Sequence, residues 1–380
     1  MVFAVPEQPK TELGRYRILS STAGVRVSPI VLGGLSLGQS WSSIMGAMDE
    51  EQSFKLLDAY TDAGGNFIDT ANNYQNEESE KYIGKWMAAR GNRDLLFVAT
   101  KFTNCFRTHE LGTGKTVNYG GNHKKSLRLS VEHSLRKLQT TYIDLLYVHW
   151  WDWTTSIEEL MDSLHNLVQQ GKVLYLGISD TPAWVVATAN TYAKDHGKTP
   201  FSVYQGRWNV MRRDFEREII PMARHFGMAL CPWDVLGGGQ FQTARQLEVR
   251  DKSTQGSRSS AQSEEARHIS AALEKVAFDH GIDSIQQIAL AYVMQKARNV
   301  FPIVGGRKVE HLHDNIGALS IRLTDEQIQY LDSVKDFDLG FPLNFIGDDP
   351  KEVGSQPQLF ENLTGAKIAW QKSPKPIGHD

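Results

Sequence analysis

The feature that most constrains the fold is a repeated alternation of a short apolar segment with a longer segment of helical periodicity. Strands that alternate with helices predict βαβ units and a parallel sheet. Eight such units predict a (β/α)₈ TIM barrel, and a doubly wound open sheet is the alternative. The expected strands are residues 30–34, 66–69, 95–101, 143–149, 173–178, 202–205, 228–232 and 300–304.

Residues around these segments carry the signals of turns and helix starts. Two β-like runs within residues 16–27, on either side of Ala23-Gly24, predict an N-terminal hairpin before the barrel. Helix starts are marked by a capping residue, by Glu or Gln three residues later, or by proline in the first turn. The expected starts are at Asp49, Ser156 (with Glu159), Thr181-Pro182 and Thr324 (with Gln327).

Three segments interrupt the alternation: residues 103–124, 237–263 and 336–380. Loops of this length are commonly functional lids or disordered segments. The first two follow the ends of expected strands, so we expect them to cover a site as a lid or a cofactor-binding belt. We expect residues 1–335 to form one barrel domain, and residues 336–380 to be a C-terminal tail of the same domain.

Composition narrows the class of protein. The formal net charge of −3 argues against nucleic-acid binding, which requires a surplus of Lys and Arg. Cys105 and Cys231 are far apart, and the histidines lack metal-ligand spacing, so neither a disulfide framework nor a metal is expected. No apolar run reaches the ~20 residues of a membrane helix, and the N-terminus lacks a signal-peptide core. The expectation is a cytoplasmic protein with neither a nucleic-acid nor a membrane partner.

Two short motifs point to other chemistries but lack the required context. Residues 34–38 match the G-x-S-x-G nucleophile elbow, yet they follow the first expected strand and lead into Gln39-Ser40-Trp41 without a helix signal. We expect this segment to line a cofactor cleft instead. Gly114-Lys115-Thr116 resembles the end of a P-loop, but His109 occupies the position of the first glycine. No G-x-G-x-x-G motif follows a strand, which argues against a Rossmann domain.

Ionisable residues end three of the expected strands. Asp69, Lys101 and His149 each terminate an otherwise apolar run, and Tyr74 follows Asp69 in the next loop. Parallel barrel strands bring their C-terminal ends to one face, so the four side chains are expected to meet. Singly, a Lys–Asp pair can be a structural ion pair, and a histidine beside Trp150 can be a core residue. Four such groups on one face favour a catalytic centre.

This set of residues suits carbonyl reduction. Hydride attack on a carbonyl carbon builds negative charge on oxygen, which requires a proton donor. A free tyrosine, with a pKa of about 10, is a weak acid at neutral pH. We expect the Lys101 ammonium to lower the pKa of Tyr74, and Asp69 to keep Lys101 charged. His149 can hydrogen-bond the substrate oxygen.

The segment Gly65–Tyr74, together with Lys101 and the sequence Tyr147-Val148-His149-Trp150, resembles the aldo-keto reductase superfamily. It is most similar to the fungal aryl-alcohol dehydrogenase and norsolorinic-acid-reductase-like branch. The resemblance covers roughly residues 13–335 and implies a barrel, an NADP(H) cofactor and a catalytic tetrad. Tyr74 would donate or accept the proton, Asp69 and Lys101 would tune it, and His149 and Trp150 would contact substrate with Tyr74.

The resemblance also implies a set of cofactor-binding residues, most of them after strands five to eight. Many relatives have Asn where this chain has Asp180, and Tyr or Phe where it has Trp233. Gly34, Leu35 and Asp69 would line the cleft; Ser179, Asp180 and Gln205 would hold the nicotinamide carboxamide, and Trp233 would stack on the ring. Asp234, Val235, Leu236, Gly237, Gly238, Gly239 and Gln240 would surround the pyrophosphate; Gly305, Arg307 and Lys308 would bind the 2′-phosphate; and His311, Asp314 and Asn315 would face the adenosine.

The expected function is therefore an NADP(H)-dependent oxidoreductase that interconverts aldehydes or ketones with alcohols. The tryptophans near His149 favour an aromatic substrate. The alternative is a non-catalytic NADP(H)-binding sensor or regulatory subunit on the same fold, and a turnover assay with NADPH separates the two.

Overall fold

The computed structural model describes residues 7–251, 262–355 and 357–378. At its centre is an eight-stranded sheet in the order β10-β3-β4-β5-β6-β7-β8-β9, with every neighbouring pair parallel. The strands are β3 (Val31–Gly33), β4 (Phe67–Asp69), β5 (Phe97–Phe102), β6 (Ile143–Val148), β7 (Val173–Ser179), β8 (Phe201–Arg207), β9 (Ala229–Trp233) and β10 (Ile303–Val304).

Backbone hydrogen bonds join the two edges of this sheet. Leu230 N in β9 donates to Asn299 O at 2.9 Å, and Phe301 N donates to Leu230 O at 2.8 Å, so the chain just before β10 pairs with β9. The sheet thus forms a nearly closed barrel. The predicted (β/α)₈ fold is confirmed, and the open-sheet alternative is wrong.

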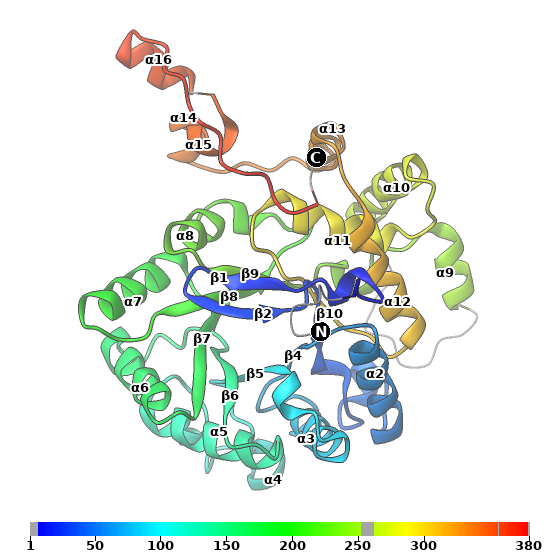
Figure 1. Cartoon of the computed structure of the whole chain (residues 1–380), viewed down its shortest axis with the longest axis vertical. Helices are drawn as coiled ribbons and strands as arrows, with labels where there is room; N and C mark the ends of the chain where they lie inside the picture. The colour runs from blue at the N-terminus through cyan, green and yellow to red at the C-terminus, as the bar shows by residue number, and fades with distance from the viewer. Residues whose placement is uncertain (1–6, 252–261, 356, 379–380) are drawn as a thin grey trace.

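Side chains alternate between the inside and the outside of the barrel, as the period of two along a strand requires. Phe67, Phe97 and Leu145 fill the interior, whereas Ile68 and Val98 belong to the larger core between strands and helices. The outer layer (Figure 1) consists mainly of α2 (Glu50–Asp62), α3 (Glu78–Arg90), α5 (Lys124–Lys137), α6 (Ile157–Gln169), α7 (Ala183–Asp195), α8 (Ile219–Phe226), α10 (Glu264–Asp279), α11 (Ile285–Lys296), α12 (Val309–Gly317) and α13 (Asp325–Ser333).

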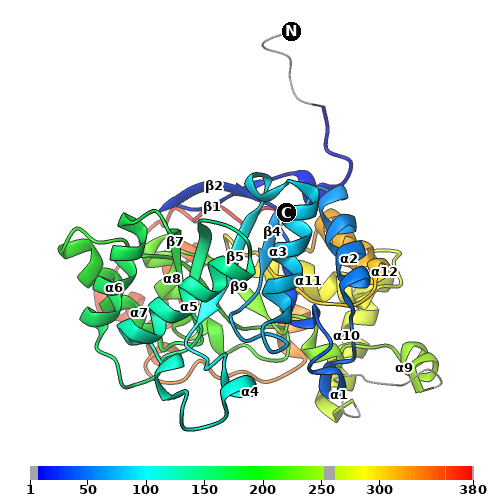
Figure 2. The ribbon, with the colours of Figure 1, turned by 90° about the horizontal axis from the view of Figure 1, so that it is seen from below.

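An N-terminal hairpin of β1 (Arg17–Ser20) and β2 (Ala23–Val27) lies across one end of the barrel (Figure 2). Its turn is at Ser21 and Thr22, not around Ala23-Gly24 as predicted. Hydroxyl groups stabilise this turn: Thr22 N donates to the Ser20 hydroxyl at 3.3 Å, and the Thr22 hydroxyl donates to that of Ser202 at 2.9 Å. Gly24 is therefore part of a strand.

Most predicted helix starts are confirmed. Asp49 and Thr324 each form a complete capping box. Ser156 caps α6, but Glu159 does not reciprocate, because its carboxylate accepts from Lys124 N at 3.1 Å. The prediction that Pro182 lies in the first turn of α7 is wrong. Its ψ of 140° is extended, so it is the N-cap and the helix begins at Ala183.

The three long loops contain short helices. Residues 103–124 include α4 (Thr108–Leu111), and residues 237–251 include α9 (Ala244–Asp251), while residues 252–261 of that loop lie outside the described residues. A one-turn helix that was not predicted, α1 (Ser42–Met45), lies in the loop after β3, the first strand of the barrel in the chain. In Figure 2, α1, α4 and α9 all lie at the end of the barrel opposite the hairpin.

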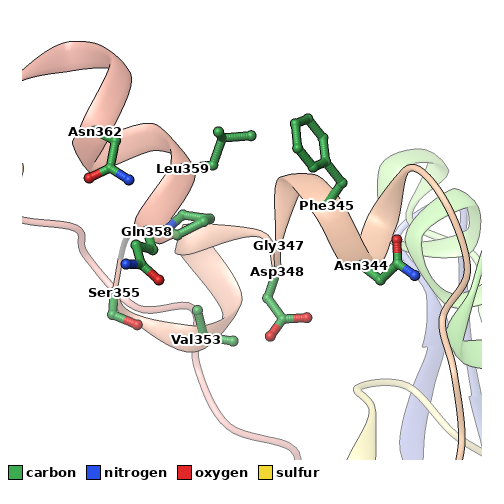
Figure 3. A pocket seen from close by; sticks show the side chains of 10 residues that line it. Asn344, Phe345, Gly347, Asp348, Val353, Ser355, Gln358, Leu359 and Asn362 are labelled. Atoms are coloured by element: carbon green, nitrogen blue, oxygen red, sulfur yellow. The ribbon is translucent and has the colours of Figure 1, made fainter.

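The C-terminal tail projects from the barrel near α8 (Figure 1) and carries α14 (Leu343–Ile346), α15 (Pro350–Val353) and α16 (Gln358–Thr364). Arg298 fixes α15 to the barrel through Glu352 at 2.8 Å. A surface hollow within the tail (Figure 3) is lined by tail residues alone, including Phe345 and Gln358. It is therefore separate from the barrel mouth. Among the described helices, none has both the length and the apolarity needed to cross a bilayer.

Candidate active site

The four residues predicted to be catalytic lie together at the C-terminal end of the barrel. Asp69 is the last residue of β4, Lys101 lies near the end of β5, and His149 directly follows β6. Lys101 Nζ donates to Asp69 Oδ2 at 2.5 Å, to Thr70 O at 2.9 Å and to the Tyr74 hydroxyl at 3.3 Å. The strand ends thus deliver the tetrad as the sequence predicts.

The contacts of Lys101 determine whether the Tyr74 hydroxyl donates or accepts in its hydrogen bond with Lys101. An ammonium has three N–H donors and no acceptor. Lys101 directs its donors to Asp69, Thr70 O and Tyr74, so the Tyr74 oxygen must accept from Lys101. The phenolic proton therefore remains available to a second acceptor, such as a substrate oxygen. In this arrangement the Tyr74 hydroxyl can act as a hydrogen-bond donor toward a substrate oxygen.

The pKa of Tyr74 is shifted upward, whereas the sequence predicted a downward shift. Burial raises it above the usual value; the Lys101 ammonium lowers it, as expected, but only in part. Burial also disfavours charge on Lys101, yet Asp69 and Tyr74 together raise the Lys101 pKa. The resting centre therefore holds a neutral phenol, an ammonium and a carboxylate. The predicted net lowering of the Tyr74 pKa is wrong, because desolvation outweighs the lysine.

His149 completes the centre as a neutral group. Its ring lies edge-on to that of Tyr74, with centroids 5.8 Å apart and planes at 74°. Burial and the nearby Lys101 ammonium hold the pKa of His149 well below its usual range. A neutral imidazole has one N–H donor and one acceptor nitrogen. His149 can therefore donate one hydrogen bond to a substrate oxygen without carrying charge.

A second group of predicted residues lies at or just after the C-terminal ends of β7, β8 and β9. Gln205 Nε2 donates to Asp69 Oδ1 at 3.0 Å, so the carboxylate that pairs with Lys101 is held from two sides. The Ser179 hydroxyl is buried and has no hydrogen-bond partner of normal geometry within the described residues. Asp180 Oδ1 accepts from Trp233 Nε1 at 3.2 Å. The buried Ser179 hydroxyl, the Asp180 carboxylate and the Gln205 amide together offer donors and acceptors that fit a ligand with amide character.

Asp180 has an unusual acidity for a carboxylate. Desolvation by the surrounding protein raises the pKa of this carboxyl to about 6, although the residue as a whole is partly open to solvent; the Trp233 N–H and Lys101 act in the opposite direction. Its backbone has a positive φ of 40°. Asp180 thus titrates close to neutral pH.

A sequence model of the aldo/keto reductase family matches residues 29–336 of this chain. The match covers the barrel and every predicted site residue. The chain belongs to the aldo/keto reductase family. This confirms the resemblance and identifies the protein as an oxidoreductase of that family.

Curated fungal proteins are similar to this reductase over most of its length. A putative aryl-alcohol dehydrogenase of Saccharomyces cerevisiae is 64% identical over 347 residues, covering 90% of this chain and 92% of the relative. An aryl-alcohol dehydrogenase [NADP(+)] of Phanerodontia chrysosporium is 54% identical over 379 residues, covering 97% of each chain. The norsolorinic acid reductase of Aspergillus flavus is 50% identical over 373 residues, covering 98% of this chain and 93% of the relative.

The segment that follows β9, predicted to surround the pyrophosphate, is rich in glycine. Gly237, Gly238 and Gly239 have φ values of 61°, 63° and 84°, which L side chains rarely adopt. No atom lies within 4 Å of a Cβ built on Gly239, so the space beside this glycine is open, although the N–H groups of Gly237, Gly239 and Gln240 donate to carbonyls of the same turn. Asp234, at the start of the turn, is fixed by Arg207 Nε at 2.7 Å. Val235 is buried, and Leu236 and Gln240 are partly buried.

The segment after β10 leads into the N-terminus of α12. Arg307 and Lys308 are exposed there, and nothing lies within 4 Å of a Cβ built on Gly305. His311 is exposed on the same helix, whereas Asn315 is buried. Asp314 accepts hydrogen bonds from Ser284 at 2.6 Å and Gln287 at 2.8 Å, so its carboxylate packs α12 against α11.

The loop that carries Tyr74 has a strained backbone. Gln75, Asn76 and Glu77 have φ values of 52°, 49° and 77°, and left-handed non-glycine residues each cost about 1–3 kcal/mol. Lys137 holds the loop: its Nζ contacts Glu77 Oε1 at 3.0 Å and donates to Asn72 O at 2.9 Å. The sequence alone does not indicate this role of Lys137, because a lysine in a helical segment is usually expected to point into solvent.

The loop after β3 packs against the Tyr74 loop. A Cβ on Gly34 would lie 3.0 Å from Asp69 O, so only glycine fits beside the end of β4. Gln75 Nε2 donates to Leu35 O at 3.0 Å, and Trp41 N donates to Gln75 Oε1 at 2.7 Å. The Trp41 ring lies 6.4 Å from that of Tyr74. Trp41, which sequence reasoning did not select, therefore forms part of the wall beside the phenol.

The structure also brings together Glu77, His109 and Glu110, whose ligand atoms lie within 4.8 Å of one another. Their positions in the sequence show no metal-ligand spacing. Glu77 is already paired with Lys137, and the other two residues are exposed. Glu110 is paired with Arg107 at 2.7 Å, and His109 lies 3.7 Å from Glu77, so ion-pair contacts account for this cluster.

Proposed function

We propose that this protein is an NADP(H)-dependent oxidoreductase that interconverts aromatic aldehydes or ketones with the corresponding alcohols by hydride transfer. Tyr74 is the proton donor in reduction and the acceptor in oxidation. One observation carries the proposal: Lys101 directs its donors to Asp69, Thr70 and the Tyr74 oxygen, which leaves the phenolic proton for a substrate.

The residues at the barrel mouth fit a nicotinamide cofactor. Within the described residues the buried Ser179 hydroxyl has no hydrogen-bond partner of normal geometry, and the neighbouring Asp180 carboxylate can accept from an amide N–H. We assign Ser179, Asp180 and Gln205 to the carboxamide and Trp233 to the ring. The pyrophosphate is assigned to the loop from Asp234 through Gly237, Gly238 and Gly239 to Gln240. This assignment is supported by the open space beside Gly239, because the N–H groups of Gly237, Gly239 and Gln240 donate within the turn.

The preference for NADP(H) over NAD(H) is assigned to Arg307 and Lys308. Both are exposed at the N-terminus of α12, where backbone N–H groups and the helix dipole also favour an anion. A guanidinium can clamp a phosphate with two hydrogen bonds. A relative from Phanerodontia chrysosporium carries NADP(+) in its name, which supports this cofactor.

When bound, NADPH supplies the hydride. As negative charge builds on the carbonyl oxygen, Tyr74 donates its proton to that oxygen. The tyrosinate that remains is stabilised by Lys101 Nζ, which already contacts the phenolic oxygen at 3.3 Å. Asp69, fixed by Gln205, keeps Lys101 charged throughout. His149 donates its N–H to the same substrate oxygen and fixes its position.

The aromatic substrate class is supported by the rings around the centre. Trp41 and His149 both lie edge-on to Tyr74. Trp150 is 40% exposed next to His149, where a substrate ring can contact it. Relatives named aryl-alcohol dehydrogenase are consistent with such a substrate.

The test is a turnover assay with purified protein, NADPH and a panel of aldehydes, followed through NADPH absorbance. We expect turnover with benzaldehyde derivatives, weaker turnover with short aliphatic aldehydes and little with NADH. Cofactor binding without turnover across the panel would instead favour the sensor or regulatory alternative. Turnover with NADH equal to that with NADPH would contradict the role of Arg307 and Lys308.

A prediction specific to this chain concerns Asp180. Its carboxylate is ionised above a pKa of about 6 and would then favour the cationic nicotinamide of NADP⁺ over neutral NADPH. We expect the ratio of the Kd for NADP⁺ to that for NADPH to fall as the pH rises through about 6. The change should be on the order of tenfold, about 1.4 kcal/mol at 25 °C.

Fluorescence titration of the Asp180→Asn variant provides the control. This variant has no titrating carboxylate, so its Kd ratio should stay constant over the same pH range. Ionisation of the 2′-phosphate is common to both cofactor forms and largely cancels in the ratio. A wild-type ratio that does not change with pH would show that Asp180 does not face the nicotinamide.

A further inference from the structure

Asn104, in the loop after β5, contacts Nδ1 of the His149 ring. Asn104 Nδ2 lies 2.9 Å from His149 Nδ1, and Asn104 Oδ1 accepts from Trp150 Nε1 at 2.9 Å. Sequence reasoning did not select Asn104, because an asparagine in a polar loop has no distinguishing signal. These two contacts link it to two residues assigned to substrate binding.

The orientation of the Asn104 amide follows from its partners. The indole N–H of Trp150 is only a donor, so the atom facing it must be the amide oxygen. The amide nitrogen then faces His149 and also donates to Asn73 Oδ1 at 3.4 Å. In the flipped amide the NH₂ group would face the indole N–H of Trp150, so two donors would meet. The amide oxygen would then face Asn73 Oδ1, so two acceptors would meet. One orientation therefore satisfies all of these contacts.

This orientation sets the position of the proton on His149. Asn104 Nδ2–H is a donor, so His149 Nδ1 must accept and cannot carry a proton. A neutral ring then carries its proton on Nε2. We propose that Asn104 is a positioning residue that holds His149 in its Nε2–H tautomer, so that this N–H donates to the substrate carbonyl oxygen. The donation to a substrate oxygen rests on the proposed function. The tautomer of His149 does not depend on it.

The loop backbone around Asn104 supports such a role. Thr103 has a φ of 103°, a strained value for a β-branched residue. Its hydroxyl donates to Asn122 Oδ1 at 2.8 Å, and its carbonyl accepts from Gly121 N at 2.7 Å. The carbonyl of Asn104 accepts from Asn72 Nδ2 at 3.2 Å. Contacts from two other segments thus fix the residue that orients His149.

The experiment is nitrogen-15 NMR of histidine-labelled protein, which separates the two neutral tautomers and the imidazolium. The chain has 12 histidines, and the His149 signals are assigned by their loss in His149→Gln. In the wild type we expect a protonated Nε2 and an unprotonated Nδ1. In Asn104→Asp the carboxylate can only accept from the ring, so Nδ1 should become protonated. In Asn104→Leu, which offers no partner, the tautomers should be mixed.

Kinetics provide the second measurement. With Asn104→Leu we expect kcat for aldehyde reduction to fall roughly tenfold or more, as for other orienting partners of catalytic imidazoles, with a smaller change in KM. Asn362→Asp, an equivalent change on the exposed face of α16, should leave the tautomer and kcat unaltered. Protonated Nδ1 in the wild type, or an unchanged Nε2–H signal in Asn104→Asp, would overturn the proposal. Correct tautomers without wild-type turnover would instead refute the proposed function alone.

Discussion

Tyr74→Phe is expected to abolish most carbonyl reduction while leaving the cofactor site intact. The substitution removes the phenolic hydroxyl, and with it both the proton and the oxygen that accepts from Lys101 Nζ, and it leaves the ring in place. Loss of a positioned general acid typically lowers the rate by about 10²–10⁴-fold. We expect kcat for aldehyde reduction to fall within that range, measured by NADPH absorbance, and the Kd for NADPH to stay within a few-fold of the wild type.

Tyr16→Phe is the matched control, because Tyr16 is 50% exposed and precedes the hairpin at the opposite end of the barrel. It should behave as the wild type. If Tyr74→Phe retained more than a tenth of wild-type kcat, another group would have to supply the proton. The proposal that Tyr74 is the proton donor would then fail.

Lys101→Met is expected to reduce both stability and activity. The Lys101 side chain is fully buried, and only 5% of the side chain of its ion-pair partner Asp69 is exposed. Removal of the lysine leaves a buried carboxylate that, among the described residues, keeps Gln205 as its side-chain donor. Breaking a buried ion pair at one end costs about 3–5 kcal/mol in the free energy of unfolding. Chemical denaturation followed by circular dichroism measures this loss.

The double variant Asp69→Asn/Lys101→Met separates the structural effect from the catalytic one. Replacement of both ends of a buried pair by neutral groups is often close to neutral for stability. We expect the double variant to regain most of the unfolding free energy but to remain as inactive as Lys101→Met. Recovery of activity together with stability would mean that Lys101 acts only through the fold.

Much of the catalytic centre follows from the sequence because of strand geometry. Asp69, Lys101 and His149 are each the polar end of an apolar strand, and parallel barrel strands share one C-terminal face. The positions of Ser179 and Trp233 follow by the same logic, aided by family resemblance. Adjacent strands and their order could therefore be predicted without any knowledge of side-chain contacts.

The supporting residues could not be predicted in this way. Lys137 and Asn104 are polar residues on a helix and in a loop, and each acts on the centre across the space between elements. The net direction of the Tyr74 pKa was also mispredicted. The sequence indicates that a lysine is close, but only the packing around the ring shows that burial outweighs it.

The sequence by itself therefore determined the barrel, the family and the four groups that meet at its mouth, since period-two burial and strand polarity are local properties of the chain. The tertiary structure alone decided how those groups are protonated and oriented. The Tyr74 proton is free because Lys101 directs its donors elsewhere, and the His149 proton lies on Nε2 because of Asn104. Protonation and orientation depend on desolvation and on partners that are distant in the chain, which no local pattern encodes.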